Sequence, residues 1–362
     1  MTLTPKQKRN LIQIAPFGVM WFIFSFIYIF IEHGVLGDST HYPTTGNPYK
    51  FSPFLTAIVA TVSGLMIGSF EVFVLRDFFR KRNFVKKMIV KTLVYLIVII
   101  VFLVGSNVIS NSIEHSYNIL DSALWDNTGN FVFSFAFISV SLYIAALLFI
   151  CLFYTEVSDN IGQGVLLNFL KGKYHNPVEE ERIFMFSDMK SSTTIAEKMG
   201  HVQYFEMLKE YYSDQSDAII NNAGEIYKYV GDEIIITWTL KEGIESNRCI
   251  NCFFDMKKSL EKKKDHYIKK YGVFPTFKAG IHCGWVTTGE IGEVKKEITF
   301  SGDVMNATAR IQSLCKEYDQ DLIISAELMK KIENSKDLKS SKLGEVELRG
   351  KNKRVELIAI ET

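Results

Sequence analysis

Apolar residues are concentrated in the first part of the chain, where they form four long runs separated by polar segments. Each run has about 18 or more residues, the length that an α-helix needs to cross the hydrocarbon core of a bilayer. Ionisable residues are rare in the runs: Glu71 lies in the second and Lys91 in the third, and we expect both at the level of the lipid headgroups. The four expected membrane-spanning helices cover about residues 14–31, 54–75, 88–108 and 131–154.

Basic residues are distributed unevenly around these runs. Lys and Arg are frequent before the first run and between the second and third, whereas the other two connecting segments contain only Lys50. Because an excess of Lys and Arg marks cytoplasmic loops, we expect a multi-pass protein of the cell (inner) membrane. Its N-terminus and its C-terminal part are expected in the cytoplasm.

The membrane region has two interpretations. A transporter or channel usually carries ionisable or Gly/Pro-interrupted segments at membrane depth. Here only Glu71 comes near that description, and its neighbour Arg76 indicates an interfacial position. We therefore favour an anchor in the lipid bilayer, a dimerisation platform, or a sensor of an unknown ligand or membrane partner.

After residue 154 the composition changes from apolar to mixed. The segment 155–178 has an apolar stripe between Val165 and Leu170, which predicts a short helix in a cytoplasmic linker. Everything from residue 179 onward has the pattern of one compact domain. The expected organisation is a four-span region at 1–154, a helical linker at 155–178 and a soluble domain at 179–362.

Short apolar strands and amphipathic helices alternate in the soluble domain. This order predicts a mixed sheet with helices packed on one face, an α+β fold of ferredoxin-like type. One long helix is expected at 244–271, and two separate strands at 276–282 and 284–289. Further strands are expected at 182–187, 225–230, 233–239, 297–300, 321–325, 342–347 and 354–360, and further helices at 193–198, 202–222 and 303–317.

Charge and cysteine content narrow the class of protein. The net charge of +1 gives no electrostatic reason to expect nucleic-acid binding. The five cysteines are scattered without the spacing of a disulfide framework. Cys249 and Cys252 form a C-x-x-C pair in a helical stretch, and we interpret them as buried thiols in a reducing cytosol rather than as a zinc or redox site.

Two carboxylates mark the first candidate site. Asp188 follows the apolar strand Phe184-Met185-Phe186, and Asp232 lies in the turn of an apolar hairpin. Carboxylates at strand ends beside a helix N-terminus suit a pair of hard cations and a triphosphate. The hydroxyl cluster at 191–194 is expected to cap that helix, leaving its first N–H groups for phosphate oxygens. The alternative is an ordinary Asp/Ser turn without a ligand.

A second group of residues lies between Lys278 and Arg310. Glycines punctuate the expected strand and hairpin at the start of this stretch, where the backbone of another element approaches closely. Asn306 and Arg310 are four residues apart, so they share one face of the following helix. An amide and a guanidinium on that face could hold a ribose and a phosphate. The alternative is a surface pair without a ligand.

Four segments, FMFSDMKSST, IYKYVGDEII, FKAGIHCGWVTTGEIG and TFSGDVMNATAR, resemble the catalytic domain of class III nucleotidyl cyclases. The resemblance covers about residues 179–362 in unbroken motif order, and it implies the fold of that catalytic domain after a four-helix transmembrane region. It also implies two Mg²⁺ or Mn²⁺ ions held by a set comprising Asp188, Met189 and Asp232. Because this chain carries both halves of the family's shared site, it implies a head-to-tail homodimer.

The resemblance further implies roles in nucleotide binding. Lys228 and Thr299 are expected to read the purine, and Asn306 and Arg310 to orient the ribose and stabilise the transition state. The remaining expected substrate contacts are Ser192, Thr193 and Arg349, the last standing where the family often has a phosphate-binding Lys. The family usually has Gly-Phe where this chain has Ser191 and Ser192, and some relatives have a basic residue where it has Trp285.

The purine-reading pair favours ATP. Lys228 can donate to adenine N1 and the Thr299 hydroxyl can accept from the 6-amino group, whereas guanine reverses this pattern. The sequence thus predicts an adenylate cyclase that converts ATP to 3′,5′-cyclic AMP and pyrophosphate. The alternatives are a guanylate cyclase, a diguanylate cyclase with a related core, and a membrane receptor with a catalytically silent cyclase domain.

Overall fold

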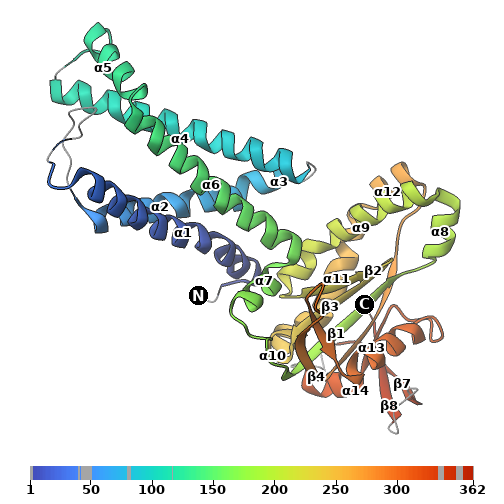
Figure 1. Ribbon diagram of the computed structural model, residues 1–362. Coiled ribbons are helices and arrows are strands. Elements are labelled where there is room, and N and C mark those ends of the chain that lie inside the picture. Colours follow the sequence, from blue (N-terminus) through green and yellow to red (C-terminus); the bar gives the residue numbers. More distant parts are fainter. Residues whose placement is uncertain are drawn as a thin grey trace. The chain divides into compact units, whose positions relative to one another are not determined.

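The computed structural model describes residues 3–39, 41, 51–79, 83–115, 117–332, 338–347 and 354–361 (Figure 1). The chain divides into two compact units, Lys8–Leu166 and a second that comprises Leu167–Thr362 with Met1–Gln7. Each unit is described by itself below.

The first unit is helical. Four of its segments, Pro5–Leu36, Pro53–Leu75, Phe84–Ile113 and Phe135–Ile161, are long and apolar enough to cross a membrane, as expected. The short helix α5 precedes the last of them, so that segment starts at Phe135 rather than near residue 131. The elements are α1 (Pro5–Leu36), α2 (Pro53–Phe70), the π-helical turn η1 (Glu71–Leu75), α3 (Arg76–Phe78), α4 (Phe84–His115), α5 (Ser122–Val132) and α6 (Phe135–Ile161).

Glycines let α1 and α2 pack closely. A Cβ atom on Gly64 would lie 2.8 Å from the carbonyl oxygen of Phe17, and one on Gly68 would lie 2.9 Å from the Phe17 ring. Small residues spaced four apart allow such close approach between membrane helices, where packing rather than the hydrophobic effect drives association.

Glu71 and Lys91, which we expected at the level of the lipid headgroups, form an ion pair inside the helical unit. Both side chains are buried between helices, and Lys91 Nζ of α4 pairs with Glu71 Oε1 of η1. The hydroxyl of Tyr95 donates to Glu71 Oε2 at 3.0 Å. The two charges lie on facing helices and neutralise each other, which removes the need for contact with water or headgroups.

Two further ion pairs hold the last part of α6. Lys87 Nζ of α4 lies 2.7 Å from Glu156 Oε1, and Arg76 Nη2 of α3 lies 2.9 Å from Asp159 Oδ1. Arg76 thus pairs with α6 and not with its neighbour Glu71. Gln13 of α1 joins the same group, since its side chain contacts both Arg76 and Asp159.

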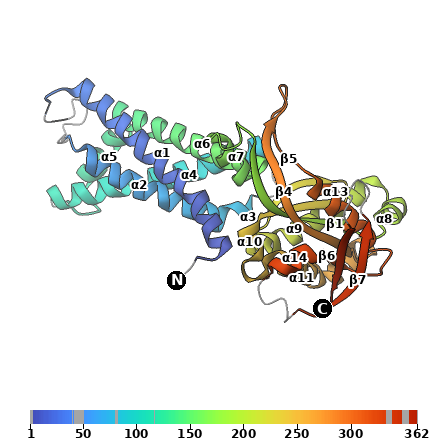
Figure 2. The same cartoon turned by 90° about the horizontal axis from the view of Figure 1, so that it is seen from below.

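The second unit is built on an eight-stranded mixed sheet with the order β2-β3-β1-β4-β6-β8-β7, and β5 pairs with β4. Only β4 and β6 pair in parallel among the described strands. Figure 2 shows the β4–β5 hairpin projecting beyond the rest of the sheet. The strands are β1 (Val178–Met189), β2 (Glu225–Val230), β3 (Glu233–Thr239), β4 (Phe277–Ile291), β5 (Glu297–Ser301), β6 (Leu322–Ser325), β7 (Ser340–Glu347) and β8 (Arg354–Ile360).

Helices cover both faces of this sheet, so the expectation of helices on one face is wrong. Successive residues of β1 point to opposite faces. Ile183 and Met185 pack against α9 and α11, whereas Phe184 and Phe186 pack against Val304 of α13. The helices of the unit are α7 (Gln163–Leu170), α8 (Ser192–Met199), α9 (His201–Asn221), α10 (Leu240–Ile244), α11 (Arg248–Glu261), α12 (Lys264–Tyr271), α13 (Asp303–Leu314) and α14 (Ala326–Lys331), with a 3₁₀ turn η2 at Glu245–Asn247.

Two element boundaries differ from expectation. The expected helix at 244–271 is two helices, α11 and α12, separated at Lys262 and Lys263. The expected strands at 276–282 and 284–289 form one continuous strand, β4. Gly284 does not end a strand; a Cβ there would lie 2.7 Å from Val304 Cγ2, so the glycine makes room for α13.

Candidate active site

The two expected carboxylates lie together at one end of the sheet. Asp188 is the second-last residue of β1 and pairs across the sheet with Glu233, the first residue of β3. Asp232 occupies the β2–β3 turn directly before Glu233, so it lies beside Asp188. The Tyr212 hydroxyl of α9 donates to the carbonyl oxygen of Gly231 at 2.6 Å and fixes this turn.

The pair is electrostatically strained. Burial, together with the nearby negative charge of Asp232, raises the pKa of Asp188, and the neighbouring Lys278 and Gln312 oppose this. Lys278 Nζ lies 3.6 Å from Asp188 Oδ2, and Gln312 Nε2 donates to the same oxygen at 3.1 Å. Burial and the two aspartates also raise the pKa of Glu233 to about 7.

The residues present fit a divalent cation. Asp232 Oδ2 is buried and has no hydrogen-bond partner, which leaves an acceptor that a cation would satisfy. Mg²⁺ is typically held by one or two carboxylates together with substrate phosphates and water. Among the described residues no group of three or more His, Cys, Asp or Glu side chains is arranged to hold a metal by itself. The side chain of Met189 is buried in the core, so only its carbonyl oxygen could contribute.

Helix α8 begins at Ser192, and only Lys190 and Ser191 separate it from the end of β1. Ser191 has φ 57°, a left-handed conformation that favours glycine. Its side chain makes no capping hydrogen bond, so the expected hydroxyl cap from this residue is wrong. Ser192 is half-buried and Thr193 is exposed in the first turn of α8.

The two expected purine-reading residues lie on strands that come close to each other. Lys228 of β2 is exposed, and its Nζ lies 3.8 Å from Glu297 Oε2 of β5. Thr299 is half-buried in β5, where it pairs with Gly289 of β4. The register of β2 shifts between Ile226 and Lys228, and such a bulge re-aims the neighbouring side chains.

Asn306 and Arg310 lie on the exposed side of α13, while Ala307 and Ile311 are buried against the sheet. No described contact within the chain brings Asn306 or Arg310 to the carboxylate pair. Arg349 lies outside the described residues.

Four contributors to the carboxylate site were missed from the sequence: Glu233, Lys278, Gln312 and Tyr212. The pairing of Asp188 with Lys278 across β1 and β4 would have placed Lys278 there, had the register been known. Gln312 reaches the site because Gly280 has no side chain; a Cβ there would lie 2.4 Å from the Gln312 nitrogen.

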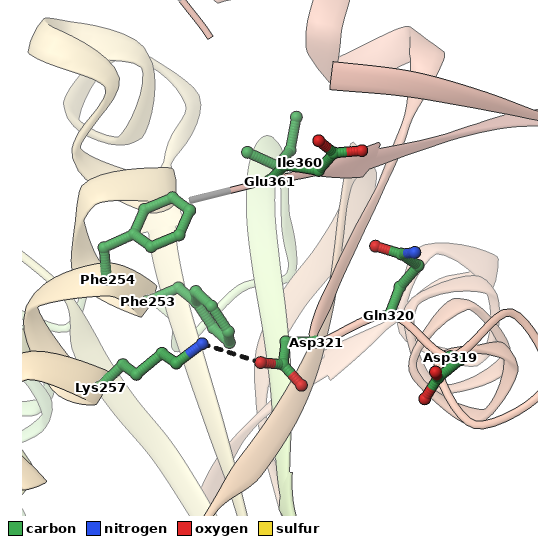
Figure 3. A pocket seen from close by; sticks show the side chains of 8 residues that line it. All are labelled: Phe253, Phe254, Lys257, Asp319, Gln320, Asp321, Ile360 and Glu361. Carbon is green, nitrogen blue, oxygen red and sulfur yellow. Dashed lines mark hydrogen bonds and ion pairs between the residues drawn. The ribbon is translucent and has the colours of Figure 1, made fainter. Parts of the chain in front are cut away.

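Another hollow lies on the same unit, between α11, the segment before β6 and the end of β8 (Figure 3). It contains none of the expected site residues. Its Asp321 is paired with Lys257 at 2.8 Å and with Lys190 at 2.5 Å. The charges at its centre are thus satisfied within the chain.

Residues 175–361, more than half of the chain, match the adenylate and guanylate cyclase catalytic domain. The chain belongs to this family, and the expected fold class is confirmed. Adenylate cyclase 2 of Rhizobium meliloti (strain 1021) is 33% identical over 209 residues, which are 58% of this chain and 58% of that protein. An adenylate cyclase of Anabaena cylindrica is 27% identical over 153 residues, 41% of this chain and 30% of that protein.

The matched region therefore spans 58% of the length of the first relative and 30% of the length of the second. Among solved structures, a bacterial light-regulated adenylyl cyclase is similar with a TM-score of 0.46 and 22% identity, over 51% of this chain and 52% of that chain.

Proposed function

We propose that this protein is a membrane-anchored adenylate cyclase, which converts ATP to 3′,5′-cyclic AMP and pyrophosphate. The observation that carries the proposal is the pair Asp188 and Asp232, with its unpartnered Asp232 Oδ2, beside the start of α8. The pair lies in a domain of the cyclase family, and the relatives named above are adenylate cyclases. The four apolar helices supply the anchor, with the catalytic domain in the cytoplasm.

Asp188, Asp232 and the carbonyl oxygen of Met189 would hold the Mg²⁺ or Mn²⁺ ions. When bound, these ions lower the pKa of the ribose 3′-hydroxyl and neutralise the phosphates. The first turn of α8, with Ser192 and Thr193, offers N–H and hydroxyl donors to phosphate oxygens. Arg349 is proposed as a further phosphate contact.

In the reaction the ribose 3′-oxygen attacks the α-phosphorus, and the bond to the bridging oxygen of pyrophosphate breaks. The 3′-hydroxyl proton passes to Asp188 or to water. Asn306 orients the ribose, and Arg310 donates to the phosphoryl oxygens where negative charge develops, an effect typically worth about 3 kcal/mol.

Base choice is assigned to Lys228 and Thr299. Lys228 donates to adenine N1, and the Thr299 hydroxyl accepts from the 6-amino group. Glu297 Oε2 of β5 lies 3.8 Å from Lys228 Nζ, so this contact directs the Lys228 side chain toward β5.

The active form is proposed to be a homodimer with shared sites. Asn306 and Arg310 are exposed on α13, and no described contact joins them to the carboxylate pair of their own chain. A second copy would bring its Asn306 and Arg310 to Asp188 and Asp232 of the first, and head-to-tail pairing in a closed two-fold dimer gives two equivalent sites.

The test is cyclic-nucleotide production by the full-length protein in membranes, with ATP or GTP and Mg²⁺ or Mn²⁺. We expect cyclic AMP from the wild type, none from Asp232→Ala, and an unchanged rate from the surface control Glu356→Gln. Cyclic GMP as the main product would instead favour a guanylate cyclase. Silence with both nucleotides would favour a receptor with an inactive cyclase domain.

A further inference from the structure

Arg182 is a buried cation in the interior of the second unit. It lies on β1 and its side chain is only 4% exposed. Alternation along the strand places it on the same face as Phe184 and Phe186, the face covered by α13. Burying a guanidinium costs free energy, and this cost is offset only by specific hydrogen-bond and ionic partners. The contacts of Arg182 therefore indicate its role.

The guanidinium of Arg182 joins two strands that are not neighbours in the sheet. Nη2 donates to Glu225 Oε2 of β2 at 3.0 Å. The same group lies over the ring of Phe300 in β5, 4.9 Å from its centroid. A planar cation stacked on a ring and hydrogen-bonded at its edge fixes both partners in orientation as well as distance.

These two strands carry the proposed purine-reading residues. Glu225 lies three residues before Lys228, and Phe300 follows Thr299 directly. The rings of Tyr227 and Phe300 also touch, with centroids 4.9 Å apart. Arg182 and Tyr227 therefore both contact the Phe300 ring, and these contacts link β2 to β5.

A second layer of contacts holds Arg182 itself. Glu180 Oε1 lies 3.5 Å from Arg182 Nε, and it accepts hydrogen bonds from Thr288 at 2.8 Å and from the Tyr174 hydroxyl at 3.1 Å. Tyr174 is buried, and its carbonyl oxygen accepts from the Glu290 nitrogen of β4 at 3.0 Å. The arrangement thus continues from the purine-reading strands to the segment that leads from α7 into β1.

We propose that Arg182 is a positioning residue of the purine site: by joining Glu225 to Phe300 it sets the distance between Lys228 and Thr299. Tyr174 and Glu180 hold Arg182 in place, so the position of the segment between α7 and β1 affects the choice between ATP and GTP. This proposal rests on the proposed function, because it concerns the residues assigned there to the purine.

The experiment compares Arg182→Lys with the wild-type full-length protein. Lysine keeps the charge but loses the plane that stacks on Phe300 and the fork that reaches Glu225. We expect kcat/KM for ATP to fall about tenfold and the preference for ATP over GTP to narrow by a similar factor, the size typical for loss of one oriented contact. Phe300→Leu, which leaves Arg182 in place, should shift the preference in the same direction.

The matched control is Glu181→Gln. Glu181 is the preceding residue of β1 and pairs with Lys331 on the other side of the sheet, so its loss removes an ion pair without touching Phe300. An unchanged ATP-to-GTP ratio in Arg182→Lys, in protein that still unfolds cooperatively, would show that Arg182 only stabilises the fold and would overturn the proposal.

Nucleotide affinity measured by calorimetry separates this proposal from the proposed function. If the wild type makes no cyclic nucleotide but binds ATP more tightly than GTP, and Arg182→Lys loses that difference, the positioning role stands and the proposed function fails. If the wild type converts ATP to cyclic AMP while Arg182→Lys keeps the wild-type ATP-to-GTP ratio in both turnover and affinity, the proposed function stands and the positioning role fails. Absence of binding to either nucleotide in the wild type would overturn both.

Discussion

Gln312 donates a hydrogen bond to Asp188, 3.1 Å from Nε2 to Oδ2, and thereby ties the helix that carries Asn306 and Arg310 to the carboxylate pair of the same chain. Gln312 is 6% exposed, and its close approach to β4 depends on the missing side chain of Gly280. Arg310 lies two residues before Gln312 on α13. One helix thus supports a carboxylate of its own chain on one side and presents the guanidinium on the other.

Gln312→Leu should lower the stability of the fold, because the half-buried carboxylate of Asp188 loses its amide donor. Hydrogen bonds to charged groups are worth about 1.5–3 kcal/mol, so we expect the free energy of unfolding without metal to fall by about 2 kcal/mol. Denaturant unfolding measures this change. The control is Ser313→Ala, an exposed neighbour on the same helix, and an equal loss in both variants would contradict the role given to Gln312.

Mixing two inactive variants should restore activity if the site is shared between two subunits. Asp232→Ala lacks a metal carboxylate and Arg310→Ala lacks the transition-state cation, and a mixed dimer has one intact site. With random pairing, half of the dimers are mixed, so about a quarter of wild-type cyclic AMP production is expected. Coexpression followed by an activity assay measures it, with each variant alone as control; no recovery in mixed dimers would exclude the shared arrangement.

Ser191→Gly should stabilise the second unit, which contains the sheet. A non-glycine residue in the left-handed region costs about 1–2 kcal/mol, and glycine removes most of that cost at φ 57°. We expect a gain of about 1 kcal/mol in the free energy of unfolding. Thr193→Gly, the second residue of α8, is the matched control and should instead lose about 0.4 kcal/mol. A loss of stability in Ser191→Gly would contradict the strain at this turn.

Removing one partner of the buried pair in the helical unit should be costly. Lys91→Met leaves the Glu71 carboxylate buried with Tyr95 as its remaining described partner, and breaking a buried pair in this way typically costs about 3–5 kcal/mol. Thermal unfolding in detergent measures the loss. Glu71→Gln in the Lys91→Met background should recover part of it, since no isolated charge remains. Lys264→Met, which breaks an exposed pair with Glu261, should change little.

Asp321 should make stability depend on pH. Burial acts to raise the pKa of its carboxyl, but hydrogen bonds from Lys190 and Lys257 outweigh it and hold the pKa below the usual value. A depressed pKa means that this contribution is present above the unfolded value of about 4 and is lost as the pH falls through the folded pKa. The stability gap between wild type and Asp321→Asn should therefore narrow from pH 7 toward pH 3, as measured by denaturant unfolding; a constant gap would contradict the assignment.

The bounds of β2 and β3 were predicted to the residue, because apolar runs on either side of a Gly-Asp turn determine them locally; the register shift between Ile226 and Lys228 was not predicted. The course of β4 was not, because Gly284 looks like a strand end until α13 is packed against it. The partnership of Asp188 with Asp232 followed from their strand-end positions. Gln312 and Arg182 were missed because their roles depend on contacts across the sheet, which no local pattern encodes.

Helix α6 is held by ion pairs with two other helices. Lys87 of α4 pairs with Glu156, and Arg76 of α3 pairs with Asp159. A piston stroke or a rotation of α6 by itself would separate both pairs. We therefore expect α6 to change position together with α3 and α4, as one group of helices rather than as a single moving segment.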